Sequence, residues 1–114
     1  STEFNNTPYE QQMRTLQEYI KIHCVHPISI SDLCKVLAVS PQHVCRIFKK
    51  TLGIHPTEYI NQVRIELACS MLLYSNLSIK EIGEKCGFQN TSYFCKKFKQ
   101  FEHLTPLEYR NSVI

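Results

Sequence analysis

The chain contains one segment twice, half a chain apart, and this repeat limits the possible folds more than any other feature. "FKKTLGIHP" (Phe48–Pro56) recurs as "FKQFEHLTP" (Phe98–Pro106), and each copy continues into a Glu-Tyr pair after one residue. The similarity extends back to Ser29 and Ser78, interrupted only by the inserted residue Gln89. Apolar positions are retained while polar positions vary, which is typical of two copies of one packed unit.

Each copy opens with the signature of a helix start. Ser29 and Ser78 are each followed three residues later by an acidic residue, Asp32 or Glu81. This is the pattern of a capping box, in which the hydroxyl and the carboxylate each satisfy a free backbone amide. A short helix is predicted to follow in each copy.

A second helix is predicted after a tight turn. Ser40 and Asn90 are the predicted N-caps, because their side-chain oxygens can accept from the first free amides. The second helices are expected to end near Leu52 and Phe101. Gly53 can adopt the left-handed conformation that closes the first of them.

The second helix of each copy is amphipathic, with a narrow apolar face and a polar, basic face. The predicted inward residues are Val44, Ile47 and Phe48 in the first copy, and Tyr93, Phe94 and Phe98 in the second. A short capped helix, a tight turn and a second helix with a basic outer face together indicate a helix-turn-helix unit.

Three further helices are predicted: one at Pro8–His23, one at Thr57–Tyr74, which joins the copies, and a last one that begins at Pro106. With no convincing strand, the predicted fold is all-α with seven helices. The predicted organisation is a flexible tail (1–7), a first helix-turn-helix subdomain (8–55), a linker helix (56–75) and a second helix-turn-helix subdomain (76–114). One stripe of the linker helix is expected to be apolar and to pack against both units: Ile60, Val63, Leu67, Met71 and Tyr74.

The net charge of +3 is modest, but its distribution is uneven. Val39–Gly53 contains no acid but three basic residues, and so does Phe88–Phe101. Two basic clusters at equivalent places in a repeat favour binding of an acidic partner such as nucleic acid. No apolar run is long enough to cross a membrane and the N-terminus lacks a signal-peptide core, so we expect a cytoplasmic location without membrane association.

The six cysteines lie mostly at apolar helical positions, and we expect them to be reduced. The segment "HCVH" (His23–His26) looks like a metal site, but no second ligand pair stands at zinc-finger spacing. We therefore predict a helix end followed by a loop there, with no metal and no cofactor.

The segment Leu77–Arg110, "LSIKEIGEKCGFQNTSYFCKKFKQFEHLTPLEYR", resembles the signature of the DNA-binding domain of the AraC/XylS family of bacterial transcription regulators. The first copy and "RIELACSMLL" (Arg64–Leu73) match in kind, so the resemblance covers about residues 10 to 111. Two residues depart from it: His103 stands where the family usually has Gly, and Gly83 where it usually has Ala. Either departure could loosen the second unit.

This resemblance implies seven helices, with two helix-turn-helix units that enter successive major-groove segments on one face of DNA. The linker length agrees independently, because Thr57–Tyr74 spans about 27 Å as a helix. With some lateral offset, this suits recognition helices one DNA turn apart, roughly 34 Å. A monomer could then read one bipartite site.

Residues in the first two turns of a recognition helix reach base edges, and those further along suit phosphate. We expect the first unit to carry more specificity, because Gln42 can bond adenine and Arg46 guanine. The predicted base-contacting residues are Pro41, Gln42, Cys45, Arg46, Thr91, Ser92, Cys95 and Lys96. The predicted phosphate-contacting residues are Ser29, Ser31, Lys49, Lys50, Ser78, Lys97, Lys99 and Thr105.

Three alternatives to DNA binding remain open. An enzyme is disfavoured because no set of nucleophile, base and orienting group is readable, and no catalytic residue is predicted. The basic faces could instead bind an acidic protein, or Cys45 or Cys95 could serve as a redox sensor if basic neighbours lower the thiol pKa.

The expected partner is double-stranded DNA, with RNA polymerase as a further candidate. The isolated domain is expected to be monomeric. Any ligand-binding or receiver domain is expected to precede Ser1, and a full-length protein could dimerise through it. The sequence does not indicate the target genes, or whether they are activated or repressed.

Overall fold

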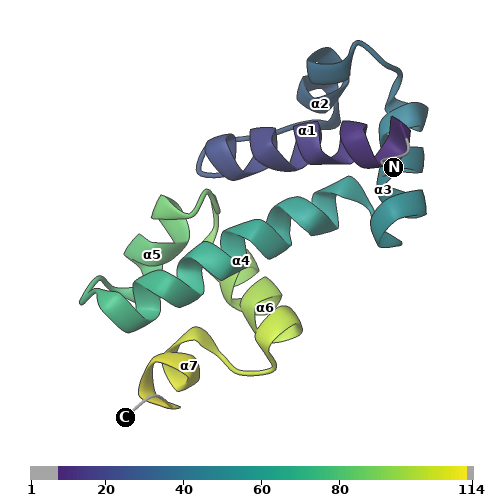
Figure 1. Cartoon of the computed structure of the whole chain (residues 1–114). Helices are drawn as coiled ribbons and strands as arrows, with labels where there is room; N and C mark the ends of the chain where they lie inside the picture. Colours follow the sequence, from purple (N-terminus) through teal and green to yellow (C-terminus); the bar gives the residue numbers. More distant parts are fainter. Residues whose placement is uncertain (1–7, 113–114) are drawn as a thin grey trace. The chain divides into compact units, whose positions relative to one another are not determined.

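The computed structural model describes residues 8–112, which form seven helices and no strand (Figure 1). The helices are α1 (Pro8–His23), α2 (Ile30–Leu37), α3 (Pro41–Leu52), α4 (Pro56–Tyr74), α5 (Ile79–Lys85), α6 (Thr91–Glu102) and α7 (Pro106–Ser112). The predicted all-α fold is confirmed. The predicted flexible tail, residues 1–7, lies outside the described residues.

The described chain divides into two compact units. Unit 1 comprises residues 8–23 and 27–60, and unit 2 comprises residues 24–26 and 61–112. The boundary falls within α4, so this one continuous helix contributes its first turn to unit 1 and the rest to unit 2. The short segment after α1 belongs to unit 2 although its neighbours in sequence belong to unit 1.

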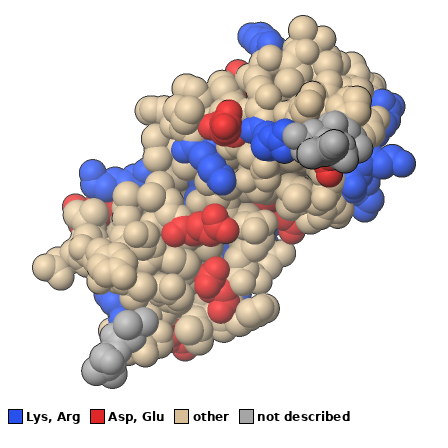
Figure 2. Space-filling view, viewed as in Figure 1, with Lys and Arg blue, Asp and Glu red and all other residues tan. Residues whose placement is uncertain are grey.

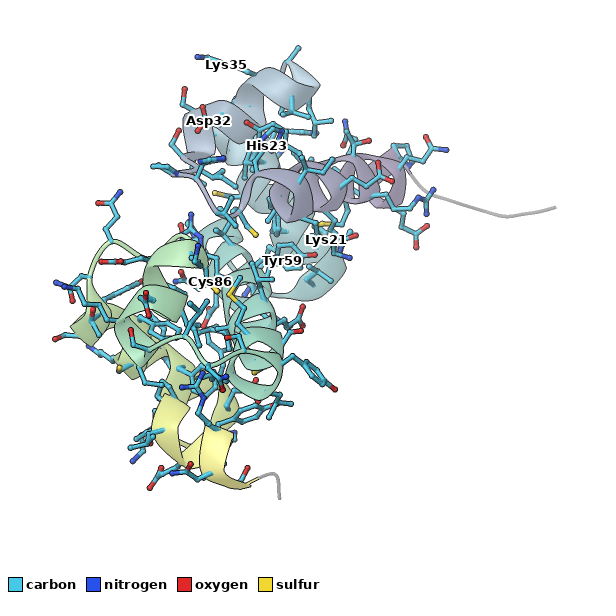
Figure 3. The ribbon with its side chains drawn as sticks, turned by 90° about the vertical axis from the view of Figure 1, so that its left-hand side faces the viewer. Lys21, His23, Asp32, Lys35, Tyr59 and Cys86 are labelled. Atoms are coloured by element: carbon cyan, nitrogen blue, oxygen red, sulfur yellow. The ribbon has the colours of Figure 1, made fainter. Side chains whose placement is uncertain are left out.

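The core of unit 1 forms where α1 packs against α2 and α3. Leu16 and Ile20 of α1 are fully buried with Leu33 of α2. The predicted inward residues of α3 are all fully buried. The ring of Phe48 packs on Tyr59, which is labelled in Figure 3, with 5.7 Å between centroids. The tyrosine of the repeated Glu-Tyr pair therefore serves the packing of its unit.

The core of unit 2 is richer in aromatic residues. Phe88, Phe94 and Phe98 are buried, and successive ring centroids lie 5.1 and 6.0 Å apart. Tyr109 packs edge-on against Phe98 at 5.4 Å, the equivalent of the Tyr59 contact in unit 1. Gly83 is buried beside Phe94, and this glycine makes room for the ring.

The predicted helix starts are confirmed. Both reciprocal hydrogen bonds of the capping box are present at Ser29 and at Ser78. Ser40 accepts from the amide of His43, and Asn90 accepts from the amide of Tyr93. These local contacts fix where the helices of each unit begin.

Left-handed residues close the second helices. Gly53 has a φ of 74°, as predicted, and His103 has a φ of 65° at the equivalent place. A side chain costs free energy in this conformation, so His103 is a strained solution to the turn that Gly53 makes without strain.

Two tyrosines that were predicted to face inward lie at the surface instead. Tyr93 of α6 is 43% exposed and Tyr74 of α4 is 84% exposed. Tyr93 lies at the edge of the buried stripe, where its hydroxyl reaches the amide of Asn61. Tyr74 is the last residue of α4, beyond the part of the stripe that the unit covers. Periodicity alone could not show where burial ends.

Arg64 attaches the segment 24–26 to the rest of unit 2. Its Nε donates to the carbonyl of Cys24 at 2.7 Å, and its Nη2 donates to the carbonyl of His26 at 3.0 Å. A side chain at Gly87, where φ is 101°, would collide with the Cys24 carbonyl and with Arg64. This glycine therefore permits both the turn between α5 and α6 and the close approach of the segment.

Candidate nucleic-acid interface

Helix α3 presents a polar face to solvent because its apolar face is fully used by the core of unit 1. The side chains of Gln42, Arg46, Lys49 and Lys50 are exposed, and Pro41 opens the helix. Cys45 is half-buried between them. Figure 2 shows Lys and Arg side chains along the edge of unit 1 where Figure 1 draws α3. All the predicted unit 1 base contacts therefore lie on one helix, and only Cys45 among them is partly covered.

A hydrogen-bonded chain of side chains orients Arg46. Oε1 of Gln12, on α1, lies 3.2 Å from Nε2 of His43, and this oxygen can only accept. Nε2 of His43 therefore carries the proton, which leaves Nδ1 to accept from Nη1 of Arg46 at 3.5 Å. This weak contact holds the guanidinium on the face of α3 that Gln42 shares.

Helix α6 presents the corresponding face of unit 2. Thr91, Ser92, Lys96 and Lys99 are exposed, and Cys95 is half-buried. Lys97 is also half-buried: its Nζ donates to Oε1 of Gln100 at 3.2 Å and lies 5.6 Å from the centre of the Tyr93 ring. The predicted positions of unit 2 thus form one face, with Lys97 at its edge.

The predicted phosphate sites at helix starts are partly occupied by the protein itself. The amides of Ser29, Ser78 and Thr105 each donate to a carboxylate three residues on. These hydrogen bonds from backbone amides lower the pKa of the Asp32, Glu81 and Glu108 carboxyl groups, which therefore stay ionised. A phosphate at these starts would meet a negative charge. Ser31 is exposed one residue into its helix.

The cysteines do not share one environment. Burial raises the pKa of the Cys95 thiol, which is opposite to the lowering expected from its basic neighbours. Burial likewise raises the pKa of Cys69 to about 11 and that of Cys86, labelled in Figure 3, to about 12. None of the six cysteines, all within the described residues, forms a disulfide.

Cys45 differs because it has a histidine partner. Its Sγ lies 3.9 Å from Nε2 of His55. The Thr57 amide donates to Nδ1 of the same ring at 3.1 Å, so the proton of the neutral imidazole is on Nε2 and points toward the sulfur.

The described part of the chain contains neither a cluster of metal-ligating side chains nor a membrane-spanning helix. Residues 8–112 contain no group of three or more His, Cys, Asp or Glu side chains placed to hold a metal ion. Within the same range, no helix combines the length and the apolar character needed to cross a bilayer.

The sequence patterns missed three polar residues of these faces. His43 and Tyr93 are each the third residue of the second helix in their unit, and Asn61 is buried beneath Tyr93. No local pattern could have revealed them, because each is defined by a partner on another helix. The only hint in the sequence is that His43 and Tyr93 occupy equivalent positions in the repeat.

Two units that each combine a capped helix, a tight turn and a second helix with an exposed polar face define a double helix-turn-helix protein, a class that binds duplex DNA. Residues 33–112 match the family described as "Helix-turn-helix domain". The chain belongs to this family, in its AraC-type branch of DNA-binding domains of transcription regulators. The resemblance drawn from the sequence is confirmed.

Curated relatives are longer proteins. The chain is 34% identical over 107 residues to the regulatory protein PocR of Salmonella typhimurium, and this alignment covers 94% of the chain and 35% of PocR. It is 32% identical over 99 residues to the uncharacterized HTH-type transcriptional regulator YdeC of Bacillus subtilis, covering 87% of the chain and 34% of the relative. The chain thus spans about a third of the length of these relatives.

Solved structures share the fold over nearly the whole chain. An AraC-type transcriptional regulator structure from Chromobacterium violaceum superposes with a TM-score of 0.87 at 26% identity, covering 94% of this chain and 96% of that one. The C-terminal domain of AraT, a response regulator from Geobacillus stearothermophilus, gives a TM-score of 0.86 at 28% identity, covering 95% and 90%. The DNA-binding domain of AdpA, solved in complex with a target DNA, gives 0.81 at 20% identity, covering 94% and 93%, and shows the fold alone.

Proposed function

We propose that this domain reads a bipartite DNA site, with the start of α3 and the start of α6 entering successive segments of the major groove. The observation that carries the proposal is the matched exposure of the two second helices. Each buries its apolar face in its own unit and leaves a polar, basic face in solvent, with no acidic residue in its first turn. Side chains at the start of a helix in this position reach base edges.

Unit 1 supplies the stronger base readout in this proposal. The side chains of Gln42 and Arg46 are of the kinds that make bidentate contacts to adenine and guanine, and Pro41 and Cys45 lie on the same helix. Unit 2 offers Thr91, Ser92 and Cys95, which are small and suit a thymine methyl, and Lys96, which suits guanine. The His43 contact favours Arg46, because a side chain that is already oriented loses less conformational entropy on binding.

The phosphate contacts follow from charge and exposure. Lys49, Lys50 and Lys99 are exposed further along the two helices, and Lys97 could join them by leaving Gln100. Ser31 offers an amide and a hydroxyl at the start of α2. At Ser29, Ser78 and Thr105 the amide donates to a carboxylate and the hydroxyl accepts from the amide three residues on, so a phosphate would have to displace these bonds. The Ser29 hydroxyl also donates to Asp32.

The wider role is that of a DNA-binding part of a bacterial transcription regulator acting in the cytoplasm. The matched segment is about a third of the length of the relatives. We therefore propose effector sensing, dimerisation and contact with RNA polymerase only for a longer protein that contains this domain. The domain alone is proposed to be a monomer that performs no catalysis. Light scattering at micromolar concentration tests the monomer, and a stable dimer would contradict it.

The test is selection of bound molecules from random duplex DNA, followed by affinity measurements across a salt series. We expect two short conserved blocks one helical turn apart, and an affinity that falls steeply as salt rises. One block would mean that only one unit reads bases. No enrichment, with binding lost at physiological salt, would overturn sequence-specific DNA binding and favour an acidic protein partner.

A matched pair of variants separates base reading from phosphate binding. Arg46→Ala is expected to weaken the selected site by about 1–3 kcal/mol and to relax its preference at one base pair. Lys49→Ala, on the same face of α3, is expected to weaken selected and random DNA alike. Equal effects of Arg46→Ala on both DNAs would reassign this residue to phosphate.

A further inference from the structure

We propose that Tyr93 is a phosphate-binding residue of the DNA interface, whose hydroxyl is held in its donating orientation by the buried amide of Asn61. This inference rests on the proposed DNA binding of α6. It assigns a DNA contact to a residue whose aromatic ring would otherwise place it in the core.

The hydrogen bond between Asn61 and Tyr93 has a defined direction. Nδ2 of Asn61 lies 3.1 Å from the Tyr93 hydroxyl oxygen, and an amide nitrogen can only donate. The tyrosine oxygen is therefore the acceptor, and its own hydrogen is directed elsewhere. No acceptor for this hydrogen is found among residues 8–112.

Burial makes this arrangement rigid. Asn61 is 4% exposed, so water cannot readily replace Tyr93 as the partner of its amide, and losing this hydrogen bond would cost free energy. The tyrosine ring is 43% exposed at the third position of α6, next to Thr91 and Ser92. The structure thus presents a hydroxyl donor of fixed direction at the start of the recognition helix.

The charges around Tyr93 favour an anion. Nζ of Lys97 lies 5.6 Å from the centre of the Tyr93 ring, on the same helix. The α6 helix has no acidic residue in its first turn, and Tyr93 lies at its N-terminal end, where the backbone dipole is positive. A DNA phosphate would meet the hydroxyl donor and the ammonium group together, whereas a base edge would gain nothing from the ammonium charge.

Unit 1 has a related arrangement at the same place. His43 is the third residue of α3, and it is held by Gln12 of α1, as Tyr93 is held by Asn61 of α4. His43 in turn hydrogen-bonds Arg46, whereas Tyr93 faces solvent. The two units therefore use one supported position differently, for base reading in unit 1 and for backbone binding in unit 2.

The experiment compares native domain, Tyr93→Phe and the double variant Asn61→Leu/Tyr93→Phe on the selected duplex and on a random one. Tyr93→Phe removes only the hydroxyl, and we expect about tenfold weaker binding to both duplexes. The slope of affinity against salt should stay unchanged, because no charge is lost. Lys99→Ala is the matched control and should lower this slope by about 1.

The double variant separates binding from folding. Tyr93→Phe alone leaves the buried Asn61 amide without its partner and lowers stability, whereas replacing both partners by apolar groups restores it. We expect the double variant to be as stable as native and still about tenfold weaker in binding.

Several results would overturn the proposal. Native affinity in Tyr93→Phe would do so, as would native affinity in the double variant, which would show a structural role alone. A changed base preference in Tyr93→Phe would assign Tyr93 to a base. If the native domain bound no selected duplex, the proposed function itself would fail, an outcome distinct from all of these.

Discussion

Gly83 of α5 faces the ring of Phe94 of α6 so closely that a Cβ at position 83 would lie 2.7 Å from Cδ2 of the ring. The repeat places a different pair, Cys34 and Val44, at the equivalent positions of the first unit. The larger side chain on one helix is matched by a smaller one on the other. Gly83 is therefore a packing requirement of unit 2 rather than a weakness in its helix.

This pair predicts a reversal of sign in a double-mutant cycle. Gly83→Ala alone should destabilise the domain by about 1 kcal/mol, because overpacking against Phe94 exceeds the gain of about 0.5–1 kcal/mol in helix propensity. In a Phe94→Val background the same change should stabilise, since the ring is gone. Urea unfolding measures all four proteins, and additive effects would contradict the contact.

The left-handed residue that ends α6 predicts an easy gain in stability. His103→Gly should stabilise the domain by about 0.5–1 kcal/mol, because glycine adopts a φ of 65° without steric cost. Gly53→Ala is the matched control in unit 1. It should destabilise by about 1 kcal/mol through backbone strain alone, because a Cβ there would meet no atom within 4 Å. Thermal unfolding measures both, and a loss of stability in His103→Gly would refute the argument.

The capping carboxylates predict a loss of stability in acid. Hydrogen bonds from backbone amides lower the pKa of Asp32, Glu81 and Glu108 in the folded protein. Their contribution is therefore fully present above the unfolded values of about 4, and it is lost as the pH falls from there through the folded pKa values.

Glu81→Gln and Glu108→Gln test this dependence. Glutamine can still cap but does not titrate, so stability should depend less on pH in the acid range while changing little near pH 7. Denaturant unfolding at a series of pH values measures it. Glu66→Gln, in the middle of α4, is the control and should follow the native curve. Identical acid curves for all the variants would show that the caps contribute nothing.

Buried Cys86 and half-buried Cys69 are predicted to be protected from alkylation. Cys86 is fully buried with a pKa of about 12, and Cys69 has a pKa of about 11, so almost no thiolate forms at pH 8. Iodoacetamide should leave both unmodified in the folded domain and label them after unfolding in urea. Peptide mass spectrometry reads each site. Labelling of folded Cys86 at the unfolded rate would contradict its burial.

The helix boundaries could be predicted from the sequence because the interactions that set them are local. A cap joins residues three apart, as between Ser29 and Asp32 or between Asn90 and Tyr93, and these pairs depend on no other part of the chain. Because the same cap patterns occur in both copies of the repeat, each helix start was supported by two independent segments. For the same reason the polar faces of α3 and α6 followed from periodicity once the apolar faces were known.

Contacts between helices decided the rest. Tyr93 was predicted to be buried because its ring continues an apolar stripe, but its hydroxyl is held at the surface by Asn61 of α4. Arg64 holds the carbonyls of residues 24–26, and Gly87 leaves them room, although nothing in the local sequence links these positions. Such partners lie far apart in the chain. Only the packing of the helices places the Arg64 donor beside the carbonyl acceptors and beside a glycine that leaves room for them.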